Sequence, residues 1–190
     1  IISIDGTGQY SSQQVHCENC CEKKHRNGEV TYYHHMLGAA IVHPEYKVVF
    51  PLAPEPIIKS DGSTKHDCER NAAKRLLQDL RREHPHLKAL IVEDGLSSNY
   101  PHLSLLDSLN MNYIIGVKPG DHQYLFHWIK DLKHESHIET DEKGVQHEFH
   151  YYQSVPLSDT HHDYRVNVLT YTETKKTGEK LRFSWVTKLA

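Results

Sequence analysis

Apolar, β-branched and aromatic residues in the first third of the chain occur in short runs that are typical of β-strands. Residues 1–5 form a short apolar run that closes with Asp5, and the glycines that follow predict that this strand breaks there. Two further runs, 30–43 and 46–52, are rich in β-branched and aromatic residues and are joined by a proline turn. They predict an antiparallel hairpin beside the first strand. Three prolines close to the end of the second run then argue against further regular pairing.

The middle of the chain changes to a helical period. Over residues 66–84 the apolar side chains recur at spacings of three and four, which places them on one stripe of an amphipathic helix. Residues 87–92 form a nearly continuous apolar run, typical of a parallel strand that is buried on both faces. A second helix over 100–109 and a strand over 112–117 follow.

After residue 120 the pattern becomes more polar. A short helix over 123–132 is expected first, and then four strands over 134–140, 145–153, 164–172 and 181–188. These strands predict an antiparallel subdomain. The elements before it predict an α/β sheet, in which three antiparallel strands precede strand–helix–strand crossovers. We therefore expect a core over 1–118 and a separate subdomain over 119–190.

Composition narrows the class of protein without indicating a partner. The 190 residues fit one domain or a core with one insertion, and no apolar stretch approaches the roughly 20 residues of a membrane span. Lys and Arg total 22 against 25 for Asp and Glu, and neither half is strongly basic, so net charge does not indicate nucleic-acid binding. The chain starts without methionine or a basic signal region, and we expect it to be a piece of a longer protein.

Two acids stand out by their position. Asp5 closes the first strand, Asp94 follows the strand after the long helix, and each precedes a glycine. If these strands are neighbours, their carboxyl ends meet at the edge where open α/β sheets bind ligands. Two carboxylates there suit Mg²⁺ or Mn²⁺, and paired ions of this kind serve phosphoryl transfer. The alternative is that each aspartate only forms a turn or caps a helix.

These residues, in this order, resemble the DDE transposases of bacterial insertion sequences. The resemblance is carried by the strand ending in Asp5, the helix containing residues 67–75 (DCERNAAKR), the strand ending in Asp94 and the strand ending in residues 116–118 (GVK). It extends over the whole chain. It implies a ribonuclease H-like core, with a β-rich insertion over 119–190. Asp5 and Asp94 match the first two acids of the family's catalytic triad.

The family's third acid is a glutamate on a helix after the insertion, within a Tyr-Arg-Glu-Lys type of signature. No such signature follows Asp94, so we expect this acid beyond Ala190, which leaves an incomplete active site in this chain. The resemblance also implies cleavage at transposon ends and strand transfer into target DNA with two Mg²⁺ ions. The implied partner is double-stranded DNA, bound by a homodimer of the full-length protein, and the implied location is the bacterial nucleoid.

Cysteine and histidine residues form a second group of candidate ligands. Three of the four cysteines lie within five positions, an arrangement unlike a secreted disulfide framework, and we expect a reducing cytoplasm. The C-x₂-C and C-x₃-H spacings in residues 16–25 are compatible with a structural zinc ion. The expected ligands are Cys17, Cys20, Cys21 and His25, with His16 or Cys68 as further candidates. The alternative is that these cysteines are free reduced thiols.

Basic residues supply the remaining candidates. Arg70, Lys74 and Arg81 share one side of the long helix, and Lys118 ends a core strand, so all four are candidate contacts to DNA phosphates. Charged residues on the wet face of a helix do not require such a function. The alternatives to a transposase are a ribonuclease H-like nuclease that only hydrolyses, a non-catalytic zinc-stabilised DNA-binding protein derived from a transposase, and a soluble α/β domain of another kind. Dinucleotide-loop, P-loop and nucleophile-elbow motifs are absent from the sequence.

Overall fold

The structure, a computed structural model, describes residues 1–62 and 65–190, with the side chains of 65–67 outside the description. Across these residues the chain forms eleven strands, three α-helices and two short 3₁₀-helices. This content confirms the predicted α/β class and is consistent with a ribonuclease H-like fold. The chain divides into two compact units: unit 1 comprises Ile1–Val92 and Leu105–Met111, and unit 2 comprises Glu93–Ser104 and Asn112–Ala190. The boundary expected at residue 118 stays a prediction.

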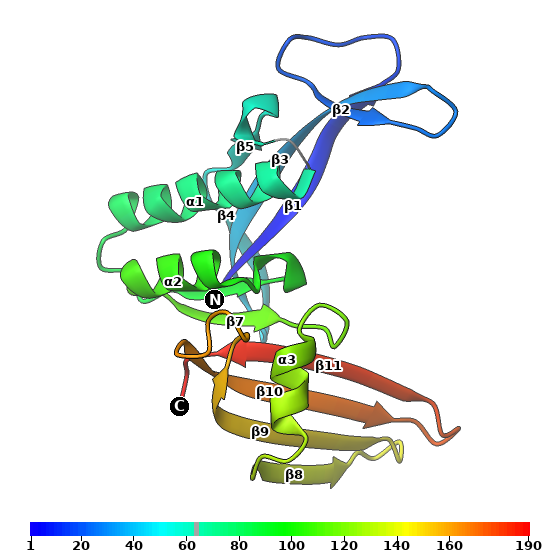
Figure 1. Ribbon diagram of the computed structural model, residues 1–190, viewed down its shortest axis with the longest axis vertical. Helices are drawn as coiled ribbons and strands as arrows, with labels where there is room; N and C mark the ends of the chain where they lie inside the picture. Colours follow the sequence, from blue (N-terminus) through cyan, green and yellow to red (C-terminus); the bar gives the residue numbers. More distant parts are fainter. Residues whose placement is uncertain (63–64) are drawn as a thin grey trace. The chain divides into compact units, whose positions relative to one another are not determined.

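Two long antiparallel strands, β1 (Ile2–Ser12) and β3 (Val30–His43), form the centre of unit 1. Figure 1 shows them side by side along the unit. β1 continues through the glycines where the sequence predicted a break, and its register shifts only after Gly8. The long partner strand pairs along the whole run, which outweighs the low strand propensity of glycine. Asp5 therefore lies within a long strand and not at its end.

β6 (Leu90–Glu93) lies on the other side of β1 and runs parallel to it. Ile2 pairs with Ile91, and Ser3 pairs with Val92. The parallel orientation is the one that the continuous apolar run predicted, and Ile91 is fully buried, as a strand covered on both faces requires.

Three short strands pair with β3 and widen the sheet of unit 1. They are β2 (Cys21–Lys24), β4 (Tyr46–Pro51) and β5 (Glu55–Ile57). The β3–β4 hairpin confirms the sequence prediction. β2 and β5 were not predicted, because β2 is mostly charged and β5 contains Pro56. A proline is compatible with pairing here since β5 is an edge strand, where a missing N–H can face away from the partner.

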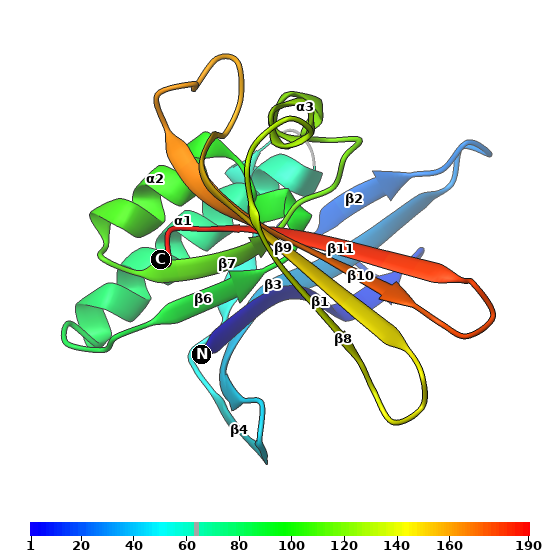
Figure 2. The same cartoon turned by 90° about the horizontal axis from the view of Figure 1, so that it is seen from below.

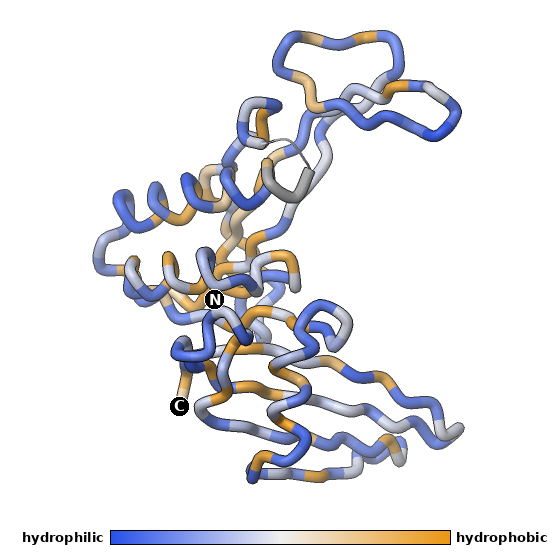
Figure 3. Tube along the Cα trace, in the orientation of Figure 1, coloured by the Kyte–Doolittle hydropathy of each residue, from blue (hydrophilic) through white to orange (hydrophobic). Residues whose placement is uncertain are grey.

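The helix α1 (Lys65–Glu83) is the amphipathic helix predicted from the spacing of apolar residues. Its stripe is buried, and the helix packs against β3 and β5. The stripe consists of Ala73, Leu76, Leu77 and Leu80. Each buried leucine contributes about 2 kcal/mol to folding. Figure 3 shows the resulting alternation of hydrophobic and hydrophilic positions along the helix. Within the described part of the chain, no helix is both long and apolar enough to cross a membrane.

Unit 2 contains an antiparallel sheet with the strand order β7-β11-β10-β9-β8. Figure 2 shows β8 to β11 side by side. The strands are β7 (Asn112–Gly116), β8 (Glu135–Thr140), β9 (Gln146–Pro156), β10 (Arg165–Thr174) and β11 (Lys180–Thr187). All five were predicted from the sequence. The two hairpins turn at Gly144 and Gly178, whose φ angles of 72° and 85° suit glycine because it has no Cβ.

Short helices connect the strands. They are η1 (Lys59–Asp61), η2 (Gly95–Ser97), α2 (Tyr100–Ser108) and α3 (Gln123–Ile129). The positions of α2 and α3 confirm the sequence prediction. α3 packs against β9 and buries Leu125 and Ile129.

Candidate functional site

The carboxylate of Asp5 is exposed on β1, on the face opposite to the buried Ile4. The residue paired with it on β3 is Gly38, which has no side chain to cover it. Its Oδ1 accepts a hydrogen bond from the N–H of Gly6 at 2.8 Å. Among the described residues, Oδ2 has no hydrogen-bond partner. One oxygen of Asp5 is therefore available to bind a ligand.

Asp94 caps the short helix η2, since its Oδ1 accepts a hydrogen bond from the N–H of Leu96 at 2.9 Å. This is the capping role that the sequence left open as the alternative. The side chain is nevertheless exposed. Its backbone contacts the end of β7. A Cβ placed on Gly116 would be 3.7 Å from the carbonyl carbon of Asp94 and 3.4 Å from the nitrogen of Gly95. Lys118 is exposed and lies two residues after Gly116 in the chain.

Glu93 is buried whereas Asp94 is exposed, a difference that the alternation of side chains along a strand predicts. Its Oε2 lies 2.5 Å from Nε2 of His102, and both side chains are only 4% exposed. The pair joins the end of β6 to α2. The residue directly before Asp94 is thereby fixed.

Ser98 and His122 hold the loop after Asp94. Oγ of Ser98 donates a hydrogen bond to the carbonyl of Gly95 at 2.6 Å and lies 2.7 Å from Nε2 of His122. The hydroxyl has one proton, so His122 is the donor in the second bond. Burial lowers the pKa of His122 below its ordinary value, and the charge of Asp121 partly offsets this effect.

Arg70 and Lys74 are exposed and lie one turn apart on α1, as the sequence predicted. Nζ of Lys74 donates to Oδ1 of Asn71 at 3.1 Å. Arg81, the third basic residue expected on this side, donates instead to backbone carbonyls and has a structural role. Its partners are the carbonyls of His84, Pro85, Leu87, Leu109 and Asn110.

Cys17, Cys20 and His34 converge beside β3. The two sulfur atoms are 3.8 Å apart, and Nε2 of His34 lies 3.4 Å from Sγ of Cys17 and 3.3 Å from Sγ of Cys20. All three ligand atoms lie within 4.8 Å of one another. Cys17 is exposed, Cys20 is buried and His34 is half-buried. This donor set can hold a metal ion.

Cys21 and His25, expected as ligands of the same ion, lie outside this group. Sγ of Cys21 donates to the carbonyl of Ile57 at 3.8 Å, and Nε2 of His25 lies 2.8 Å from Oγ1 of Thr31. The reason is that Cys21 begins β2, where consecutive side chains point to opposite faces of the sheet.

His34 was missed as a ligand by sequence reasoning. Cys21 pairs with Tyr33, and this pairing brings the Cys-x-x-Cys turn next to the histidine that follows. The only signal in the sequence was the adjacent pair His34 and His35 within a strand-like run. Choosing between them required the register of β2 against β3.

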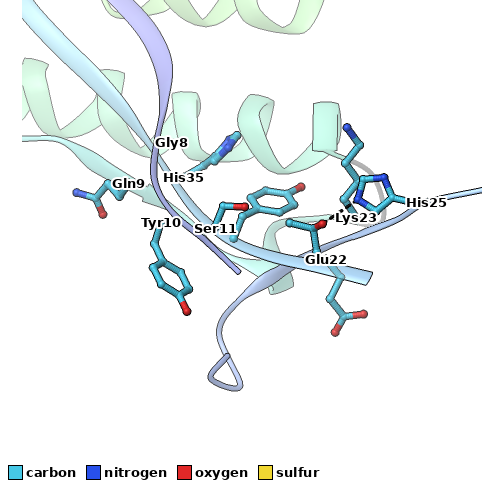
Figure 4. A pocket seen from close by; sticks show the side chains of 10 residues that line it. Gly8, Gln9, Tyr10, Ser11, Glu22, Lys23, His25 and His35 are labelled. Carbon is cyan, nitrogen blue, oxygen red and sulfur yellow. Dashed lines mark hydrogen bonds between the residues drawn. The ribbon is translucent and has the colours of Figure 1, made fainter. Parts of the chain in front are cut away.

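A cavity of about 700 Å³ lies in unit 1, and β3 lines it with Thr31, Tyr33 and His35. These residues occupy the face of β3 opposite to His34. Figure 4 shows the imidazole of His35 beside Gly8. A Cβ at Gly8 would lie 3.4 Å from Nε2 of His35, so the ring lies directly beside this backbone position. The two neighbouring histidines of β3 thus face different surroundings.

Comparisons with known proteins identify no family for the chain. No family model matches the chain, and the comparison with curated proteins found no match. Among solved structures, the chain is similar to the NurA nuclease from Sulfolobus solfataricus. The two are 13% identical with a TM-score of 0.37, over 100% of this chain and 68% of that chain. A likeness at this level assigns neither family nor activity, so the function must be argued from the chain's own residues.

Proposed function

We propose that this chain is part of the catalytic core of an enzyme that cleaves and joins DNA strands with divalent metal ions, in the manner of DDE transposases. The observation that carries the proposal is the parallel pairing of Ser3 in β1 with Val92 in β6. Asp5 and Asp94 each stand two positions further along the chain. In this proposal, these two acids supply the carboxylates of the metal site.

The two carboxylates suit a hard divalent cation. Each is exposed, each uses Oδ1 for a nearby backbone N–H, and each Oδ2 lacks a hydrogen-bond partner among the described residues. Oxygen ligands of this kind favour Mg²⁺ or Mn²⁺ over zinc. Such ions, when bound, supply the Lewis acid that stabilises the attacking and leaving oxygens of a phosphodiester.

The other residues position the acids and the DNA in this proposal. The buried pair of Glu93 and His102 links the residue before Asp94 to α2. Lys118, which follows the end of β7, contacts a DNA phosphate, and Arg70 and Lys74 provide two further charges on α1. The partner is double-stranded DNA. The third acid of the family pattern is assigned to no residue of this chain.

Metal binding by the chain itself tests the two acids. Mn²⁺ is titrated into the protein, and the free ion is measured by electron paramagnetic resonance. Asp5→Asn and Asp94→Asn are each expected to weaken binding by about tenfold or more, because loss of a ligand costs at least as much as loss of an outer partner. Asp159→Asn is the matched control. Its Oδ1 accepts the N–H of the next residue at 2.8 Å, as Asp5 does.

Strand cleavage by the full-length protein tests the reaction. A labelled duplex carrying a transposon end is incubated with Mg²⁺ and target DNA, and nicked and joined products are separated. Asp5→Asn and Asp94→Asn are expected to abolish both products, while Asp159→Asn retains them. Cleavage without joining by the wild type identifies a hydrolytic nuclease instead. Normal cleavage by either active-site variant contradicts the proposal.

A further inference from the structure

We infer that Cys17, Cys20 and His34 bind one zinc ion in unit 1. Zinc takes ligands at about 2.3 Å for sulfur and about 2.0–2.1 Å for nitrogen, so the edges of its tetrahedron are about 3.8 Å between sulfurs and about 3.6 Å between sulfur and nitrogen. The observed separations are 3.8 Å between the sulfurs, and 3.4 Å and 3.3 Å from the sulfurs to Nε2 of His34. The three atoms already have the spacing of ligands around one ion.

Hydrogen bonding does not account for this convergence. Both sulfurs approach the same nitrogen of His34, and an imidazole nitrogen has one proton or one lone pair to offer. Only one of two neutral thiols can therefore bond to this nitrogen at a time, and the other is left with the weak contact between the two sulfurs. A cation between the three atoms satisfies all of them. The N–H of Cys17 also donates to Sγ of Cys20 at 3.3 Å.

The other candidates for ligands in this segment are engaged elsewhere. The ring of His16 stacks on Tyr32 with 4.1 Å between centroids, and Sγ of Cys68 donates to the carbonyl of Gly62. Among the residues that the structure describes, the group therefore offers three ligand atoms. Cys17 is exposed, so a water molecule can reach the fourth position of the tetrahedron.

The chemistry of the donors separates this site from the proposed catalytic one. Two thiolates and an imidazole favour zinc, whereas the carboxylates of Asp5 and Asp94 favour Mg²⁺. The ion would tie the segment before β2 to β3, in addition to the stacking of His16 on Tyr32. The inference is independent of the proposed DNA chemistry, because it requires neither aspartate.

Cobalt binding tests the ligand set. Co²⁺ is titrated into the reduced, metal-free chain, and the visible bands of tetrahedral cobalt and the thiolate charge-transfer band are recorded. Wild type is expected to bind one Co²⁺, which one equivalent of Zn²⁺ displaces. Cys17→Ser and His34→Asn are expected to weaken binding by about 100-fold or more, since loss of an outer partner alone costs about 10–100-fold. Cys21→Ser and His25→Asn are the matched controls and retain the spectrum.

Alkylation of the cysteines in the wild-type chain tests the inference without variants, which could fail to fold. Iodoacetamide labelling is followed residue by residue with mass spectrometry, with and without Zn²⁺. The exposed Cys17 is expected to be alkylated readily in the metal-free chain and to be protected by zinc. Equal labelling of Cys17 in both states would overturn the inference. So would a cobalt spectrum that depends on Cys21 and not on His34.

Discussion

His102 lies within hydrogen-bonding distance of Glu93, with 2.5 Å between Nε2 and Oε2 and almost no exposure of either side chain. Glu93 is the last residue of β6, His102 belongs to α2, and Asp94 is the next residue along the chain. Loss of one member of such a pair leaves the other polar group buried without its partner. The position of Asp94 therefore depends on two residues that do not themselves face solvent.

Replacement of one member of this pair is expected to be costly. Glu93→Ala should lower the free energy of unfolding by about 3–5 kcal/mol, measured by urea denaturation. Glu83→Ala is the control, because Glu83 is 51% exposed and lies 3.8 Å from Arg82; a change within about 0.5 kcal/mol is expected. The double variant Glu93→Leu with His102→Leu should recover most of the loss. Similar small effects of Glu93→Ala and Glu83→Ala would show that the buried pair does not hold β6 to α2.

Arg75 links α1 to η1 and β5. Its loss is expected to lower the free energy of unfolding most at pH values above the pKa of its carboxylate partners. It donates to Asp61 and Glu55, each at 2.5 Å. Burial raises the pKa of Asp61, but the hydrogen bonds from Arg75 and from the N–H of Ile58, with the charge of Arg75, lower it below its ordinary value. This contribution to stability is present above the ordinary pKa of aspartate, about 3.9, and is lost as the pH falls through the lowered value.

Arg75→Ala should therefore reduce stability by about 2 kcal/mol at neutral pH and by less in acid, since hydrogen bonds to charged groups contribute about 1.5–3 kcal/mol. Urea midpoints at neutral and acidic pH measure the difference. Lys59→Ala is the comparison, because Lys59 pairs with Glu22 on the surface with 55% exposure. A loss of stability for Arg75→Ala that stays constant down to the lowest pH would contradict the assigned role of Asp61.

His122 is expected to make unit 2 less stable in mild acid. Burial lowers its pKa, so the folded state favours the neutral ring. The stability that this provides is present above the ordinary histidine pKa of about 6.5 and is lost as the pH falls through the lowered value. His122→Gln keeps a donor for Ser98 and should flatten the fall in melting temperature over this range. His127 is exposed on α3, so His127→Gln should show the same dependence of melting temperature on pH as the wild type. If His122→Gln also shows the wild-type dependence, burial of His122 does not cause the loss of stability in acid.

Local periodicity predicted most elements, and long-range pairing decided the rest. α1 was predictable because Leu76, Leu77 and Leu80 recur at helical spacing within a few residues. The pairing of residues 21–24 with β3 has no such signal, since only one of the four is apolar. That pairing is what turns Cys21 away from Cys20 and brings His34 to the cysteines.

The two proposed catalytic acids show the same difference between what local sequence patterns predict and what long-range strand pairing decides. Asp94 was singled out by its place after a buried apolar run, and the structure has it directly after β6. Asp5 was singled out by an expected strand end that the structure places instead at Ser12, because β3 continues to pair with β1 beyond it. Its exposure follows from strand alternation and from the glycine opposite, which only the register of β3 identifies.

Adjacent arginines on α1 are expected to behave differently, although the sequence presents both as basic residues of one helix. Arg81 donates to carbonyls at the ends of α1 and α2, with a distance of 2.8 Å to that of Leu109. Arg82 is 69% exposed and pairs with Asp79 on the surface. Arg81→Ala should lower the free energy of unfolding by about 2 kcal/mol or more, because several carbonyls lose a charged donor, whereas Arg82→Ala should change it by less than about 0.5 kcal/mol. Urea denaturation measures the stability of both variants. Under conditions where Arg81→Ala and the wild type are both folded, they should bind duplex DNA equally well, as measured by fluorescence anisotropy. A stable Arg81→Ala protein with weakened DNA binding would instead restore Arg81 as a phosphate contact.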